Sequence, residues 1–215
     1  MNLPNKISLA RICMIPVFVL FFFLDVVPFH YGIAAIIFIL AACTDFIDGY
    51  IARKYHLVTN LGKFLDPIAD KVLVSTAMLL ILTMKESLFD GFQSAAEPLY
   101  IATAVCICVI MARELIISAF RQIAAANGVI MAADMLGKYK TTFQDLAIFV
   151  IILAGGIGEL LPVEYAVPWD NYVAYVGLGL FAIATVLTVW SGISYVVKNK
   201  QVLKDPKQED TKKEA

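Results

Sequence analysis

Charged residues are scarce in this sequence of 215 residues: they account for 16% of the chain, whereas hydrophobic residues account for 60%. Because a soluble domain has about a quarter of its residues charged, this composition indicates an integral membrane protein. The net charge of −1 excludes a strongly basic nucleic-acid-binding protein. The four cysteines all lie in apolar stretches, so they predict neither a disulfide framework nor a metal-binding cluster.

The chain contains six apolar segments, separated by stretches that contain charged residues, at residues 12–24, 33–44, 72–84, 99–112, 146–157 and 172–197. Only the last exceeds about 18 residues without a charge. Each of the others needs charged residues at one end to reach the roughly 20 residues that cross a bilayer. We therefore predict an all-α integral membrane fold with six transmembrane helices and a short amino-terminal interfacial helix. The membrane domain occupies residues 1–197, and the charged tail 198–215 is expected to be disordered.

Lysine and arginine residues are distributed unevenly between the connections on the two sides of the membrane. When the chain is threaded with its amino terminus in the cytosol, every lysine and arginine except Lys85 falls on the cytosolic side. Cytoplasmic connections typically carry this excess of basic residues. We therefore expect both termini, and the polar stretch at residues 45–70, to face the cytosol.

Two pairs of aspartates flank the connection between the second and third predicted helices. Asp45 and Asp48 lie at the end of one helix. Asp66 and Asp70, one turn apart, lie at the start of the next, and Gly49 leaves space beside the first pair. Carboxylates so close together repel one another, so a cation is expected between them, and oxygen ligands favour Mg²⁺ or Mn²⁺ over zinc. The alternative is that the aspartates only pair with neighbouring lysines and arginines.

These aspartates belong to the pattern Asp-x2-Asp-Gly-x2-Ala-Arg-x8-Gly-x3-Asp-x3-Asp, whose fixed positions are Asp45, Asp48, Gly49, Ala52, Arg53, Gly62, Asp66 and Asp70. The same pattern is the signature of the CDP-alcohol phosphotransferases, and the chain resembles that family from about residue 2 to residue 195. Within the family, residues 2–11, 112–114 and 137–141 resemble the bacterial enzymes that make phosphatidylglycerophosphate.

The resemblance implies that a phosphatidyl group is transferred from CDP-diacylglycerol to an alcohol, with release of CMP, by a homodimer. Two divalent ions commonly clamp a phosphoryl group, and the resemblance implies that the metal ligands are Asp45, Asp48, Asp66 and Asp70. Asp70 would also be the general base that deprotonates the attacking hydroxyl. The resemblance assigns CDP-diacylglycerol binding to Ser8, Arg11, Gly49, Ala52, Arg53, Thr59 and Gly62.

The predicted acceptor is glycerol 3-phosphate, because the phosphate of such an acceptor needs cationic partners. Four basic residues of the fourth and fifth predicted helices are candidates: Arg113, Arg121, Lys138 and Lys140. Arg113 lies inside a span, where it needs a ligand or a counter-charge, and the adjacent Glu114 points about 100° away, which makes it a weak candidate partner. Alternatively, Arg113 pairs with a site aspartate and the lysines reflect only the cytosolic excess of positive charge.

Other functions remain open from the sequence. Within the same family the acceptor could be phosphatidylglycerol, which would give cardiolipin, or serine. In another class, a cation transporter also needs carboxylates within the membrane, although near the bilayer midplane rather than at one end of the spans. Release of CMP from CDP-diacylglycerol would distinguish the enzyme from the transporter.

Overall fold

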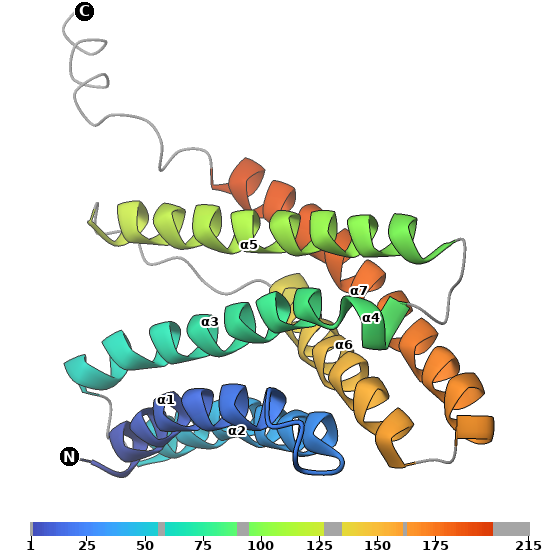
Figure 1. Ribbon diagram of the computed structural model, residues 1–215. Helices are drawn as coiled ribbons and strands as arrows, with labels where there is room; N and C mark the ends of the chain where they lie inside the picture. Colours follow the sequence, from blue (N-terminus) through green and yellow to red (C-terminus); the bar gives the residue numbers. More distant parts are fainter. Residues whose placement is uncertain (1, 56–58, 90–94, 127–134, 161–162, 200–215) are drawn as a thin grey trace, which may run out of the picture.

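The computed structural model of the chain describes residues 2–55, 59–89, 95–126, 135–160 and 163–199 (Figure 1). No strand occurs in these ranges, in agreement with the predicted all-α fold. The helices are α1 (Leu3–Phe22), α2 (His30–Lys54), α3 (Asn60–Thr83), α4 (Lys85–Phe89), α5 (Ala96–Ala126), α6 (Met135–Leu160) and α7 (Val163–Lys198). The tail from residue 200 onward, which the sequence predicts to be disordered, lies outside the described residues.

Helix α1 combines two elements that the sequence analysis treats separately. It starts after Asn2, whose backbone is extended, has a proline in its first turn, and continues without a break to Phe22. Asn5 and Ser8, in its first turns, are buried against other helices rather than exposed to a membrane surface. The structure therefore differs from the prediction, because no separate interfacial helix precedes the first span.

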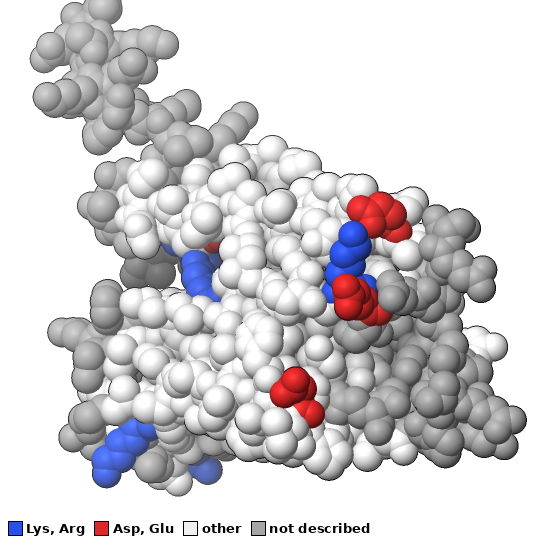
Figure 2. Space-filling model, viewed as in Figure 1, with Lys and Arg blue, Asp and Glu red and all other residues white. Residues whose placement is uncertain are grey.

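Five helices in the described part of the chain are long and apolar enough to cross a membrane: α1, α2, α5, α6 and α7. The remaining predicted span corresponds to α3, which has 24 residues but carries Asp66, Asp70 and Lys71 in its first half. Figure 2 shows one face of the molecule, where charged side chains are few and uncharged atoms cover most of the surface. A lipid-facing surface requires this distribution, and the protein is an integral membrane protein.

The helices pack so that the start of α1, the end of α2 and the start of α3 lie together, at the left of Figure 1. Helix α1 contacts α2 and α3, α2 also contacts α6, and α7 contacts both α6 and α5. Buried side chains at these contacts include Phe18, Phe38, Ile81, Ile148 and Phe181. By contrast, α3 has few contacts with α5 and α6, and a cavity lies between these three helices.

The short helix α4 lies in the connection between α3 and α5, where the sequence analysis predicts no helix. Lys85, at its start, forms an ion pair of 2.9 Å with Glu97 at the start of α5. The Lys85 ammonium also lies 4.9 Å from the centre of the Tyr100 ring. These contacts fix the end of α3 against α5 at the side opposite the aspartates.

Candidate active site

The start of α3 is attached to α1 by hydrogen bonds around Thr59. The Thr59 hydroxyl accepts a hydrogen bond from the Gly62 backbone N–H at 3.0 Å, which caps α3. It donates to the Asn5 side-chain oxygen at 2.8 Å. A Cβ atom at Gly62 would lie 2.9 Å from that same oxygen, so glycine permits the close approach of the two helices. The packing thereby sets where the aspartates of α3 lie relative to α1.

Arg11 connects α1 to the end of α2. Its guanidinium is fully buried and donates from Nη1 to Asp45 Oδ1 at 2.8 Å and from Nε to Thr44 Oγ1 at 3.0 Å. The Asp45 side chain is 46% exposed, so its carboxylate is held from the buried side and accessible from the other. A buried guanidinium needs such a carboxylate partner. Arg11 therefore orients Asp45.

Ser8 holds an aspartate of α3, as Arg11 holds an aspartate of α2. Its buried hydroxyl donates to Asp66 Oδ1 at 2.5 Å, a short hydrogen bond typical of a hydroxyl that faces a carboxylate. Asn5, Ser8 and Arg11 follow one another at intervals of three residues, so they form a polar stripe on one face of α1. This spacing was a signal in the sequence. The resemblance assigned Ser8 and Arg11 to CDP-diacylglycerol, whereas these hydrogen bonds go to two of the predicted metal ligands.

The described carboxylates suit a divalent cation by their chemistry and by the hydrogen bonds that hold them. Each of Asp45 and Asp66 has one oxygen held by α1, an arrangement typical of carboxylates that bind a metal through the other oxygen. Their oxygen donors suit Mg²⁺ or Mn²⁺. Among the described side chains, however, no three candidate ligands converge on one point. The side chains of Asp48, Ala52 and Arg53, on α2, lie outside the described residues, so the cluster of four aspartates stays a prediction.

Asp70 lies between the aspartates and the cavity bounded by α3, α5 and α6. It interacts electrostatically with Asp45 and Arg11 on the first side and with Glu114 and Lys140 on the second. Asp70 also lines the cavity, which has a volume of about 90 Å³. A molecule in the cavity would thus meet Asp70 at its border with the aspartate site.

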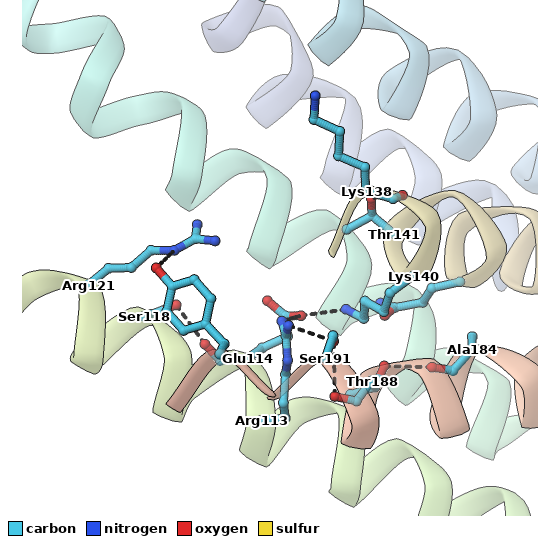
Figure 3. Close-up of polar contacts among 12 residues, drawn as sticks. Arg113, Glu114, Ser118, Arg121, Lys138, Lys140, Thr141, Ala184, Thr188 and Ser191 are labelled. Carbon is cyan, nitrogen blue, oxygen red and sulfur yellow. Dashed lines mark hydrogen bonds and ion pairs between the residues drawn. The ribbon is translucent and has the colours of Figure 1, made fainter. Parts of the chain in front are cut away.

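Lys140 and Glu114 form the central ion pair of this cavity (Figure 3). Lys140 is buried on α6, and its ammonium donates to Glu114 Oε1 from α5. Arg113 donates to the same Glu114 oxygen at 3.1 Å and to Ser191 Oγ on α7 at 3.0 Å. The expectation that Glu114 is a weak partner for Arg113 is therefore wrong, because the long Arg113 side chain bends back to it.

The other two basic candidates are not brought to the cavity. Lys138 is exposed, and Figure 3 shows its side chain pointing away from the Glu114–Lys140 pair. Arg121 donates to the Tyr195 hydroxyl at 3.3 Å and lies 5.4 Å from the centre of that ring. Neither residue is among those that line the cavity. Only Lys140 of the four predicted residues lines it.

Sequence analysis did not assign Glu114, Gln144 or Asp145 to the acceptor site, although all three line the cavity. Asp145 lies on α6 at the start of a long apolar stretch. A carboxylate so placed is costly in a membrane and usually functional, so a signal was available for it. Nothing in the linear pattern shows that these residues face α3.

Comparison with known proteins identifies the wider relationship. A family model described as CDP-alcohol phosphatidyltransferase matches residues 1–190. A Bacillus subtilis protein named CDP-diacylglycerol--glycerol-3-phosphate 3-phosphatidyltransferase is 38% identical, over 94% of this chain and 97% of that protein. Proteins with the same name from Rickettsia bellii and Escherichia coli K12 are 37% and 38% identical, over 90% and 91% of this chain and 93% of each relative.

Proposed function

The chain belongs to the CDP-alcohol phosphatidyltransferase family, and on that premise we propose that it transfers the phosphatidyl group of CDP-diacylglycerol to glycerol 3-phosphate. The products are phosphatidylglycerophosphate and CMP. The relatives' names contain both substrates, and the similarity extends over nearly the whole of each protein. Beyond the names, one observation supports a phosphorylated acceptor: a buried lysine, Lys140, lines a small cavity that borders Asp70.

Members of this family generally depend on a divalent metal. We infer that the metal is Mg²⁺ or Mn²⁺, bound as two ions by Asp45, Asp48, Asp66 and Asp70. When bound, such ions neutralise the diphosphate oxygens. Arg11 and Ser8 position the carboxylates of Asp45 and Asp66. The remaining residues assigned to CDP-diacylglycerol, on α2 and at the start of α3, are Gly49, Ala52, Arg53, Thr59 and Gly62.

Asp70 is proposed as the general base. A hydroxyl oxygen of glycerol 3-phosphate attacks the phosphorus atom that carries the diacylglycerol group, and the bond from that phosphorus to the oxygen of CMP breaks. Asp70 takes the proton of the attacking hydroxyl, and CMP leaves with the electron pair of the broken bond. The position of Asp70 suits this role because it borders both the aspartate site and the cavity.

Lys140 is proposed to bind the acceptor phosphate. An ammonium has three N–H donors, and Glu114 accepts from one of them. Lys71 also lines the cavity and adds a second positive charge. The cavity is small, with a volume of about 90 Å³, which favours a small polyol over a second phospholipid. This argues against phosphatidylglycerol as the acceptor.

The test is steady-state kinetics of CMP release with three acceptors: glycerol 3-phosphate, phosphatidylglycerol and serine. We expect efficient turnover only with the first. Lys140→Ala should raise the KM for glycerol 3-phosphate by about 10-fold to 100-fold, the scale of a charged hydrogen bond, with little change in the KM for CDP-diacylglycerol. Lys85→Ala removes the same charge far from the cavity and is the control. Preferential use of another acceptor would contradict the proposal. An equal rise in the KM values for glycerol 3-phosphate and CDP-diacylglycerol in Lys140→Ala would indicate that Lys140 has a structural role.

We also propose a topology and an assembly. Both termini and the active site face the cytosol, in a homodimer whose membrane domain spans residues 1–197 and is followed by a charged tail. The uneven distribution of lysine and arginine supports the orientation, and the family resemblance supports the dimer. Large apolar side chains that can contact lipid are exposed on every long helix. Cross-linking of the protein in native membranes would test the dimer, since a chain that only ever ran as a monomer would contradict it.

A further inference from the structure

Two polar side chains of α6, Gln144 and Asp145, line the cavity and have no part in the reaction as described so far. Gln144 is 2% exposed. Its amide nitrogen lies 4.0 Å from the Met78 sulfur, and its amide oxygen has no hydrogen-bond partner among the described residues. Whichever way the amide is turned, one of its ends stays unpaired. Buried polar groups are nearly always hydrogen-bonded, so this amide is suited to a polar ligand in the cavity.

Asp145 is the neighbour of Gln144 and shares the cavity wall with it. Its charge interacts with those of Asp70 and Lys140, which border the same space. No hydrogen bond or ion pair of Asp145 is found among the side chains that the structure describes. A carboxylate within a membrane-embedded helix is costly unless something pairs with it. A hydroxyl group is a suitable donor to such a carboxylate.

The order of the polar residues along α6 gives the cavity two chemically different ends. Lys140 and Thr141 come first, and Gln144 and Asp145 follow one turn later, about 6 Å further along the helix axis. The first end carries the positive charge, and the second carries hydrogen-bonding groups without positive charge. Met78 and Met111 close the remaining wall with apolar surface. A ligand that carries a phosphate at one end and hydroxyl groups beyond it matches this order.

We propose that Gln144 and Asp145 recognise the acceptor's middle hydroxyl, the one that does not react, and so make the enzyme specific for a vicinal diol phosphate. With its phosphate at Lys140 and its middle hydroxyl at Gln144 and Asp145, the acceptor is held at two points, and the terminal hydroxyl is directed to Asp70. The inference rests on the proposed function, because it concerns the same acceptor.

The test compares glycerol 3-phosphate with 3-hydroxypropyl phosphate, which has the phosphate and the terminal hydroxyl but lacks the middle one. In the wild type, kcat/KM should be at least about tenfold higher for glycerol 3-phosphate, because a site built to bind a hydroxyl rejects the analogue without it. In Gln144→Met and Asp145→Leu this ratio should fall toward one through loss of activity with glycerol 3-phosphate. Gln122→Met, an exposed site on α5, should keep the wild-type ratio.

The outcomes separate this inference from the function on which it rests. If the wild type does not use glycerol 3-phosphate, the proposed function fails. If it does, and both variants keep the wild-type ratio, only the hydroxyl recognition is overturned. Asp145→Leu removes a charge from a membrane-embedded helix, so it should fold even if Gln144→Met does not. An unchanged KM for CDP-diacylglycerol identifies a variant whose first substrate site is intact.

Discussion

The hydrogen bond from Ser8 to Asp66 gives a prediction that separates two roles for Ser8. In Ser8→Ala the buried hydroxyl that donates to Asp66 Oδ1 at 2.5 Å is lost. Loss of a hydrogen bond to a charged group costs about 1.5–3 kcal/mol, and loss of a partner behind a metal ligand weakens metal binding about 10-fold to 100-fold. The two ranges agree, since about 1.4 kcal/mol corresponds to tenfold. Asp66 is only half-buried, so water can replace part of the lost bond and the lower end is expected.

The assay is the initial rate of CMP release from CDP-diacylglycerol, measured at increasing Mg²⁺ or Mn²⁺ with purified protein in detergent. The metal concentration for half-maximal rate should rise by about tenfold, and the rate at saturating metal should stay close to that of the wild type. Ser118→Ala is the matched control, because the Ser118 hydroxyl donates to the backbone carbonyl of Glu114 in its own helix at 2.6 Å rather than to a carboxylate. Its metal dependence should not change.

A different result would refute this reasoning in a recognisable way. If Ser8→Ala kept the wild-type metal dependence but raised the KM for CDP-diacylglycerol, Ser8 would contact the nucleotide, as the family resemblance implies. Its hydrogen bond to Asp66 would then be incidental to metal binding. A fall in stability with no change in either measurement would leave Ser8 with a purely structural role.

Three further predictions concern the aspartates and the topology. Asp45→Asn and Asp66→Asn should each abolish CMP release at any metal concentration, because a neutral amide is a weak ligand; full activity of the wild type after exhaustive dialysis against EDTA would contradict a metal requirement. Asp70→Asn should lower kcat by about 100-fold or more and still bind CDP-diacylglycerol; turnover at the wild-type rate would show that another group is the base. In a background without the native cysteines, an impermeant thiol reagent applied to intact cells should label Glu86→Cys but not Tyr55→Cys; the reverse pattern would invert the proposed orientation.

The sequence alone determined the class of protein, the approximate positions of the helices and the family. Apolar runs that are nearly long enough to cross a bilayer indicate that each helix is surrounded by lipid, since charged groups are costly there. The pattern from Asp45 to Asp70 is local, so helical spacing was enough to predict that its aspartates lie at the end of α2 and the start of α3. The boundary of α1 and the short helix α4 were not predicted, because they depend on contacts rather than on hydropathy.

Only the tertiary structure decided which polar groups meet. Ser8 and Arg11 share a face of α1 by their spacing, yet the spacing does not say that this face contacts Asp66 and Asp45. Among the four basic candidates, only Lys140 lines the cavity, because α6 turns it toward Glu114 on α5. These contacts join helices far apart in the chain, and the angle and rotation at which helices pack depend on side chains of both partners. A periodic pattern within one helix does not show which helix packs against it.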